Sequence, residues 1–407
     1  MQYLLQAARY IFPLITIPYL TRILGPDTFA VRAYMISVMA CFMVIIDYGF
    51  TPYGTKKIAD ALGTNEREDI ECKMCGGITQ LRLILCVLMT PILCVMMSFI
   101  PLMSENKLYV VIVFISTCFT ALLPDFVFQG KEDMGIITHR FTLTQIFSII
   151  CIFCFVHSAQ DLVLVAVFEL ASAVIAFIWS WGNVIIKQKI TPKLTPLKEL
   201  RPIFNTSTAF FISTAATTII ATLTTVVLGI VEEPTQVAYW SLAMTAVVAV
   251  QSLYTPLAQS LYPHMCARKD FSLAARLLKI GIPVGVIGSV LFACLSNIVF
   301  WLIGGEEYVA GSFVLVMLSP LFVFSFVSQI LGYPVLAAVG HVKQLTESSV
   351  IAAGCNILLM VILLIISQFN LLTACVLRVV VEIILCISRI YFVSCWQKEQ
   401  RISKTDK

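Results

Sequence analysis

Charged side chains lie inside long apolar stretches of this chain, where a charge is costly. The basic ones are Arg9, Arg22, Arg32, Arg82, Arg378 and Arg389, and the acidic ones are Asp47, Asp125, Glu169 and Glu382. At the centre of a bilayer each costs about 2.5–3.5 kcal/mol on insertion scales unless it faces protein or water. Such residues indicate either a polar pathway through the membrane or internal ion pairs.

Four of the arginines, Arg22, Arg32, Arg82 and Arg378, are predicted to bind an anionic substrate. Arg22 and Arg32 flank the turn Gly25-Pro26-Asp27, on the side of the membrane where basic residues are otherwise rare. Arg82 lies about 7 Å into the third apolar stretch, and Arg378 lies about 10 Å into the last one, at 1.5 Å per helical residue. Cations at several depths suit an anion that crosses the membrane.

The acidic side chains are predicted to take part in ion coupling or gating, because carboxylates in a membrane interior commonly hold protons or ions. They are Asp47, Asp125, Glu169 and Glu382. Internal pairing is the alternative interpretation. Arg378 and Glu382 are four residues apart on one helical face and could neutralise each other.

Pairing at helix ends is a similar alternative for two of the acids. Asp47 is close enough to the inner face of the membrane to pair with Lys56, and Asp125 is close enough to pair with Lys131. Two further arginines near the membrane boundary could extend their long side chains to water: Arg9 and Arg389. The residues alone leave the functional and structural interpretations open.

The positions of the tryptophans and the composition explain what surrounds these charges. Each tryptophan falls at the end of an apolar stretch, where its ring settles at the headgroup boundary: Trp179, Trp181, Trp240, Trp301 and Trp396. With 59% hydrophobic and 12% charged residues, a soluble fold would have too little polar surface to cover itself. The chain is therefore predicted to be a polytopic membrane protein.

Charged residues, glycine, proline, asparagine and aspartate divide the sequence into about twelve spans of the length that crosses a bilayer. They are 3–24, 29–50, 77–103, 108–129, 142–158, 162–186, 207–230, 237–262, 278–303, 312–337, 346–367 and 371–396. Because lipid cannot satisfy backbone groups, these spans are predicted to be helices, which gives an all-α fold.

Basic residues gather in alternate loops, which predicts the orientation. The loops around 52–76, 187–206 and 263–277 are long and basic, whereas the opposite loops are only a few residues long and mostly acidic. By the positive-inside rule both termini are cytoplasmic, which requires an even number of spans. The short outer loops leave no room for an outer catalytic domain.

The sequence also repeats itself weakly. Thr51-Pro52 returns as Thr255-Pro256, and Thr21 to Gly25 is echoed by Thr225 to Gly229, both displaced by 204 residues. This spacing predicts a six-helix bundle at 1–187, a cytoplasmic linker at 188–206 and a second bundle at 207–407. Because six is even, the two bundles are predicted to be parallel, with a central cavity between them.

The sequence lacks the motifs that are typical of several kinds of chemistry. The chain has no phosphate-binding loop of the G-x-x-x-x-G-K-[ST] type. Cys72 and Cys75 form an isolated C-x-x-C pair, and the histidines have no zinc-type spacing: His139, His157, His264 and His341. No metal, cofactor or nucleic-acid partner is predicted.

Four segments resemble, in order and spacing, the Wzx-type O-antigen flippases of the multidrug/oligosaccharidyl-lipid/polysaccharide exporter superfamily. They are Pro18–Pro26, Asp47-Tyr48-Gly49-Phe50, Pro124–Glu132 and Gln251–His264. The chain departs from the pattern in its short N-terminus and in Asp125 and Val127, where an aromatic residue is more usual. The motif positions that match, besides Arg22 and Asp47, are Gln129, Gln251, Gln259, Pro263 and His264.

The resemblance implies a transporter of the bacterial inner membrane rather than an enzyme. Such a flippase moves an oligosaccharide linked to undecaprenyl pyrophosphate, an O-antigen or lipopolysaccharide precursor, from the inner to the outer leaflet by alternating access. Its implied partners are membrane lipid, a polysaccharide polymerase and chain-length proteins. A pyrophosphate is also the kind of anion that intramembrane arginines would attract.

Other functions remain alternatives. A drug/cation antiporter of the same superfamily would favour acidic groups, whereas arginines are in excess here. A membrane-embedded polymerase or glycosyltransferase usually needs a catalytic acidic motif on a sizeable loop, and the inner loops show none. A scaffold that transports nothing would not need so many charges at membrane depth.

Overall fold

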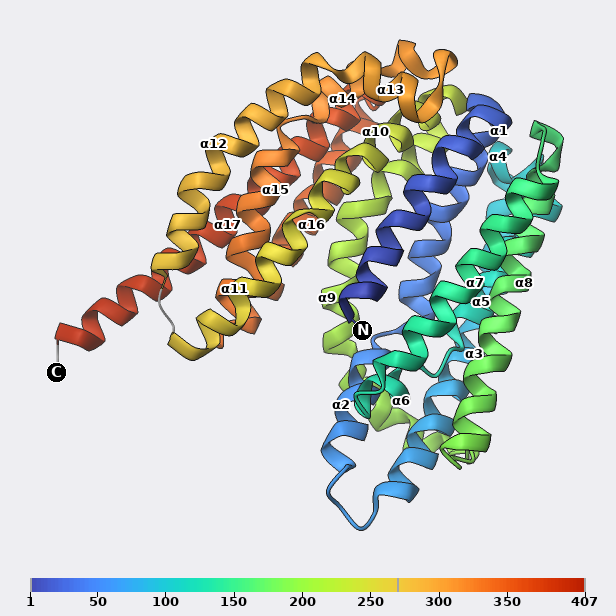
Figure 1. The fold of residues 1–407 in the computed structure, drawn as a ribbon, viewed down its shortest axis with the longest axis vertical. Helices are drawn as coiled ribbons and strands as arrows, with labels where there is room; N and C mark the ends of the chain where they lie inside the picture. The colour runs from blue at the N-terminus through green and yellow to red at the C-terminus, as the bar shows by residue number, and fades with distance from the viewer. Residues whose placement is uncertain (1, 269–270, 406–407) are drawn as a thin grey trace. The chain divides into compact units, whose positions relative to one another are not determined.

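The computed structural model describes residues 2–268 and 271–405, and in this part of the chain it is helical without strands (Figure 1). Eleven stretches of it are long and apolar enough to cross a membrane. The prediction of an all-α membrane fold is confirmed. The predicted inner loop at 263–277 lies partly outside the described residues.

The chain divides into two compact units, Met1–Thr218 and Ile219–Lys407. The division falls inside helix α9 (Leu197–Val231), later in the chain than the predicted linker at 188–206. The physical reason is that the first turns of α9 pack on the first unit: Leu200 and Ile203 belong to the buried cluster of that unit, and Phe204 and Phe210 pack against it. Only the first part of the predicted linker is non-helical.

The first unit begins with a long helix that contains two of the predicted spans. Gly25 in α1 (Gln2–Asp47) has non-helical torsion angles, φ 68° and ψ 172°, at the predicted turn between 3–24 and 29–50. Figure 1 shows the two segments of α1, both blue, running side by side from this point. Counting these segments separately gives the twelve spans predicted from the sequence.

The remaining helices of the first unit follow the predicted spans, with two additional interruptions. They are α2 (Phe50–Ala61), α3 (Arg67–Phe99), α4 (Pro101–Ser104), α5 (Lys107–Ala121), α6 (Asp125–Gly130), α7 (Met134–Phe155), η1 (Ala159–Asp161), α8 (Leu162–Gly182) and the π-helical η2 (Asn183–Lys187). Tyr48 and Gly49 separate α1 from α2 with positive φ, and residues 122–124 separate α5 from α6.

The second unit has the same succession of spans. Its helices are α10 (Pro234–Ser252), α11 (Tyr254–Arg268), α12 (Ser272–Cys294), α13 (Ser296–Gly304), η3 (Glu306–Gly311), α14 (Phe313–Leu318), α15 (Leu321–Ile330), the π-helical η4 (Leu331–Ala337), α16 (Val342–Ile365) and α17 (Leu371–Thr405). Leu253 separates α10 from α11.

The interruption after α1 recurs at the repeat position of the second unit. Gly49 immediately precedes α2, and Leu253, displaced from it by 204 residues, immediately precedes α11. Thr51-Pro52 and Thr255-Pro256 therefore lie in the first turn of equivalent helices. This agreement gives the weak sequence repeat a structural counterpart.

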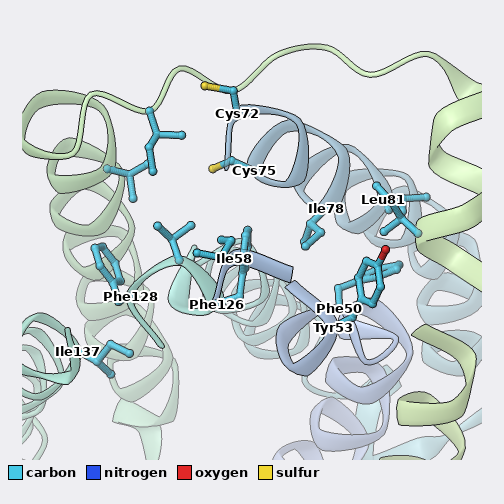
Figure 2. Close-up of a cluster of buried hydrophobic side chains, with 14 of the residues drawn as sticks. Phe50, Tyr53, Ile58, Cys72, Cys75, Ile78, Leu81, Phe126, Phe128 and Ile137 are labelled. Carbon is cyan, nitrogen blue, oxygen red and sulfur yellow. The ribbon is translucent and has the colours of Figure 1, made fainter. Parts of the chain in front are cut away.

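A buried apolar cluster joins α2, α3 and α6 in the first unit. Figure 2 shows Phe50 and Ile58 of α2, Ile78 of α3, and Phe126 and Phe128 of α6 in this cluster. All five residues are fully buried. The cluster therefore ties together α2 and α6, the helices that follow the two interruptions, and packs both against α3.

Candidate functional site

Arg82 is the most completely enclosed of the four arginines predicted to bind an anion, with 2% of the residue exposed. It lies on α3, where its guanidinium donates to the Asp47 carboxylate at the end of α1. It also donates to Thr51 Oγ1 at 2.7 Å and to the carbonyl oxygen of Leu123 at 2.9 Å. The Phe126 ring lies 5.6 Å from its Cζ atom. Arg82 thus joins the interruption after α1 to the interruption after α5.

Arg32 also has a carboxylate partner. Its Nη2 donates to Glu169 Oε1 at 2.8 Å, which joins the second segment of α1 to α8. The Arg32 side chain is 12% exposed and that of Glu169 is 31% exposed. The two residues are 137 positions apart, so only the fold brings them together.

Asp125 pairs with Arg140 rather than with Lys131. Arg140 on α7 donates to both carboxylate oxygens of Asp125, at 2.6 and 3.0 Å, and to Ser180 Oγ at 2.7 Å. Lys131 instead contacts the buried Glu71 at 2.8 Å. The expected helix-end pair is wrong because α7 begins at Met134, so that Arg140 lies inside a helix and not in a loop.

Asp47 likewise does not pair with Lys56 in this structure. Its partners are Arg82 and the hydroxyl of Thr51, which donates to Asp47 Oδ1 at 2.7 Å. The α-helix ends at Asp47, and Lys56 lies in α2 beyond the interruption and is exposed. A buried guanidinium therefore takes the place of the expected surface lysine.

A polar cluster in the second unit contains the fourth predicted arginine. Arg378 and Glu382 of α17 are joined at 2.9 Å, as their spacing predicted. Glu382 Oε1 accepts from Ser328 Oγ of α15 at 2.8 Å. Arg389, about two helical turns after Glu382 on α17, donates to the Ser328 carbonyl at 2.6 Å. Its guanidinium thus bonds within the protein, and the alternative that it extends to the boundary is wrong.

The other predicted positions lie apart from these ion pairs. Arg22 is exposed, three residues before Gly25. Gln129 accepts from Thr55 Oγ1 at 3.3 Å in the first unit. The remaining motif positions lie at the end of α10 or on α11: Gln251, Gln259, Pro263 and His264. Their roles stay predictions.

Arg32, Arg82 and Arg378 share a second property. In each, the Nε atom is buried and has no hydrogen-bond partner among the described residues. A buried N–H group without a partner costs about 1–3 kcal/mol. These arginines are therefore paired with carboxylates, while the Nε–H group of each has no partner among the described residues.

Sequence reasoning missed Arg140 and Ser328. The predicted fifth span began at residue 142, which left Arg140 in a loop, whereas α7 includes it. Ser328 is one of many serines in apolar spans and carries no distinguishing signal in the sequence. The bidentate geometry and the shared hydrogen bonds appear only in three dimensions.

Arg140→Lys is expected to lower the thermal stability of the protein. An ammonium group cannot reproduce the two parallel bonds to Asp125 together with the bond to Ser180. Each buried charge-assisted hydrogen bond that is lost costs about 1.5–3 kcal/mol. The melting temperature of the purified protein in detergent measures the change. Arg276→Lys, on an exposed residue of α12, is the control, and equal melting temperatures for both variants would contradict the prediction.

Comparison with known proteins gives relatives over most of the chain. A protein of Escherichia coli (strain K12) with the name "Putative O-antigen transporter" is 25% identical over 362 residues, which are 88% of this chain and 86% of the relative. A protein of Shigella dysenteriae with the same name is 24% identical over 290 residues, which are 70% of this chain and 71% of the relative.

Solved structures share the fold. The lipid II flippase MurJ in an inward closed conformation has a TM-score of 0.78 at 14% identity, with 96% of this chain and 87% of that chain covered. An inward-facing multidrug resistance MATE family transporter of the MOP superfamily has a TM-score of 0.72 at 15% identity, with 98% and 96% covered. The family described as polysaccharide biosynthesis protein matches residues 2–267, which include α1 to α10 and the ion pairs of the first unit. The chain belongs to this polysaccharide biosynthesis protein family.

Proposed function

We propose that this protein is a flippase that moves an undecaprenyl-pyrophosphate-linked oligosaccharide, a repeat unit of O-antigen or another surface polysaccharide, from the inner to the outer leaflet. Membership of the polysaccharide biosynthesis protein family supports a role in surface sugar synthesis. The names of the relatives and the fold shared with a lipid II flippase support transport rather than catalysis. Alternating access is the mechanism proposed.

The observation that carries the proposal is the set of arginines that are each paired with one carboxylate. Arg32, Arg82 and Arg378 form these pairs, and the buried Nε–H group of each has no partner among the described residues. A diphosphate offers several charged oxygens and can bond an arginine in a bidentate manner. It can therefore compete with a carboxylate for the same guanidinium, which a neutral sugar cannot.

The carboxylates take on a definite role in this proposal. When a phosphate oxygen replaces Asp47, Glu169 or Glu382 beside its arginine, that carboxylate loses its cation. A carboxylate without a cation in a membrane interior binds a proton or metal cation more readily. Substrate binding and ion uptake would then be coupled at the same pairs, in keeping with the predicted ion-coupling role of these acids.

The proposed location is the bacterial inner membrane with both termini in the cytoplasm. Basic residues are concentrated in the loops on one side of the predicted spans, which the positive-inside rule assigns to the cytoplasm. From this side the protein would receive its cargo after synthesis. The proposed partners are membrane lipid, a polysaccharide polymerase and chain-length proteins that use the cargo on the other side.

Arg378→Gln/Glu382→Gln is expected to reduce transport of the lipid-linked oligosaccharide by about tenfold, the effect of losing about 1.4 kcal/mol of binding. The double change removes the guanidinium without leaving its buried partner charged. The protein is reconstituted in vesicles that contain an undecaprenyl-pyrophosphate-linked oligosaccharide. Transport is measured as the fraction of sugar that becomes accessible to a glycosidase added outside.

Lys343→Gln/Glu347→Gln provides a matched control. This pair has the same four-residue spacing in the same unit, but its side chains are 87% and 44% exposed. Normal transport is expected, because exposed pairs contribute little. If wild-type protein leaves the sugar inaccessible but exchanges protons for a cationic drug, the antiporter alternative replaces the proposal.

A further inference from the structure

The fourth span of the first unit is interrupted, and the sixth span supplies a donor at the interruption. Helix α5 ends at Ala121 and α6 begins at Asp125. Backbone carbonyls at the end of a helix have no intrahelical donor and need another partner. The Leu122 carbonyl accepts from Trp181 Nε1 of α8 at 3.1 Å, and the next carbonyl accepts from Arg82. Side chains thus satisfy two of the three carbonyls of the interruption, and the third, of Pro124, accepts from the Val127 backbone N–H at 3.0 Å.

The fourth span of the second unit is interrupted as well. After α15 the helix becomes π-helical, and Gly332 within it has non-helical torsion angles, φ −71° and ψ −108°. Arg389 donates from Nη1 to the carbonyl of Ser328, which lies in the last turn of α15. Its other nitrogens donate more weakly to Ser348 and Ser349 of α16, both at 3.4 Å.

Gly332 leaves the space that this guanidinium occupies. A Cβ atom at Gly332 would lie 2.8 Å from Arg389 Nη1 and 3.1 Å from its Cζ. The shorter distance is closer than unbonded atoms approach, so an added methyl group would displace the flexible end of the Arg389 side chain. The Arg389 guanidinium therefore packs directly against the backbone of the interruption, which is possible because residue 332 is glycine and has no side chain.

The two donors occupy equivalent places in the two units. Trp181 lies near the end of the sixth predicted span and Arg389 lies near the end of the twelfth, and the carbonyls they cap belong to the fourth and the tenth. Trp181 and Arg389 are 208 residues apart, close to the 204 of the repeat. In each unit a side chain near the end of the last span thus donates to a carbonyl at the interruption of the fourth span.

In the second unit this contact is linked to the proposed substrate pair. Ser328 accepts from Arg389 through its carbonyl and donates through its hydroxyl to Glu382, which in turn holds Arg378. The acidic and basic groups that bond within this cluster are Arg378, Glu382 and Arg389. In the first unit the Trp181 indole donates to the Leu122 carbonyl, and the link to a proposed substrate pair is made directly by Arg82, which donates to the next carbonyl and to Asp47.

We infer that Arg389 is a positioning residue that holds the interruption of the tenth span, and that Ser328 connects this interruption to the Arg378–Glu382 pair. The Ser328 carbonyl accepts both from the Leu331 backbone N–H and from Arg389, so without the guanidinium only backbone bonds hold it. The hydrogen bond of Arg389 therefore stabilises the interrupted segment against local opening. When an anion changes the position of Glu382, the change reaches Ser328 and the interruption. This inference rests on the proposed function for its substrate, and on geometry for the rest.

Hydrogen exchange tests the positioning role without any substrate. Arg389→Met keeps the apolar stem and removes the donor, and amide exchange in peptides covering residues 326–337 is expected to become faster by on the order of tenfold. Arg389→Lys, which keeps a charged donor, is expected to restore most of the protection. Arg276→Met, on an exposed residue of α12, is the control. Unchanged exchange in Arg389→Met, or equally fast exchange throughout the second unit, would overturn the inference.

A double-mutant cycle provides the second test. Gly332→Ala is expected to displace the guanidinium and to speed exchange as Arg389→Met does, whereas the double variant is expected to be no worse than either single variant. Gly354→Ala on α16, where no atom lies within 4 Å of the added methyl group, is the matched control. Additive effects of the two changes would contradict the inference.

A third test measures how fast the same variants, reconstituted in vesicles, transport the lipid-linked oligosaccharide. Arg389→Met and Gly332→Ala are expected to reduce it, and Arg389→Lys to restore it. Normal transport by Arg389→Met would overturn the link to the substrate pair. If wild-type protein transports no such lipid, the proposed function fails, while the exchange measurements still decide whether Arg389 holds the interruption.

Discussion

Arg82→Gln is expected to lower the free energy of unfolding by about 3–5 kcal/mol, because it removes a buried guanidinium and leaves the largely enclosed Asp47 carboxylate, 21% exposed, without its cation. The variant removes the partner of Asp47 and the donors to Thr51 and to the Leu123 carbonyl. Those groups lie at two interruptions of the first unit, so the loss loosens both. Thermal unfolding of the purified protein measures the effect.

The double variant Arg82→Gln/Asp47→Asn separates stability from transport. Removing both charges of the pair is expected to recover most of the melting temperature, since no unpaired charge remains. Transport of the lipid-linked oligosaccharide is expected to stay low, because the guanidinium that would bind phosphate is still missing. Recovery of both properties would mean that Arg82 has a structural role only.

The exposed pair Lys73–Asp69 is the control for this experiment. Its side chains are 48% and 47% exposed, and the two residues are joined at 2.9 Å. Lys73→Gln/Asp69→Asn is expected to leave the melting temperature almost unchanged, because exposed ion pairs contribute little to stability. A large loss in this control would show that the melting temperature reports something other than buried pairing.

Gly49→Ala is expected to destabilise the protein by about 2–4 kcal/mol, the combined cost of a left-handed backbone and of overpacking. Gly49 has φ 73°, which favours glycine. An added Cβ would lie 2.7 Å from Phe210 Cβ and 2.8 Å from the backbone nitrogen of Phe211, both on α9. Since backbone atoms cannot move aside as a flexible side chain can, the first turns of α9 have to shift.

The shift should also be visible in the aromatic side chains beside Gly49. The Tyr48 ring is stacked between Phe204 at 4.1 Å and Phe211 at 4.4 Å. Gly49→Ala is therefore expected to weaken this stack and to change the near-ultraviolet circular dichroism together with the melting temperature. Gly182→Ala, with no atom within 4 Å of the new methyl group, is the control. It is expected to leave the protein as stable or slightly more stable, and equal losses in both variants would contradict the argument.

The membrane spans could be predicted because their signal is local. An apolar stretch of the right length needs no information about distant residues, and even the turn at Gly25 was marked by its glycine and the following proline. The interruption at residues 122–124 contains Pro124, but the sequence still predicts one span over 108–129, because proline is also common inside continuous membrane helices.

The ion pairs show where local reasoning ends. Arg378 and Glu382 are four residues apart, and their pairing followed from helical geometry. Arg82 and Asp47 are 35 residues apart, and their pairing depends on how α3 packs against the end of α1. The sequence could identify these arginines as costly to bury, but it could not tell which carboxylate would offset that cost.

The one-to-one pairing of arginine and carboxylate in the first unit also has an electrical consequence. Arg32 with Glu169, Arg82 with Asp47, and Arg140 with Asp125 each sum to zero charge. Moving one elementary charge across 100 mV involves about 2.3 kcal/mol, whereas moving a neutral pair involves almost none. Moving these three pairs within the membrane would therefore be almost independent of the membrane potential. The voltage dependence of a transport cycle would then come from the charges of the cargo and of any ion bound with it.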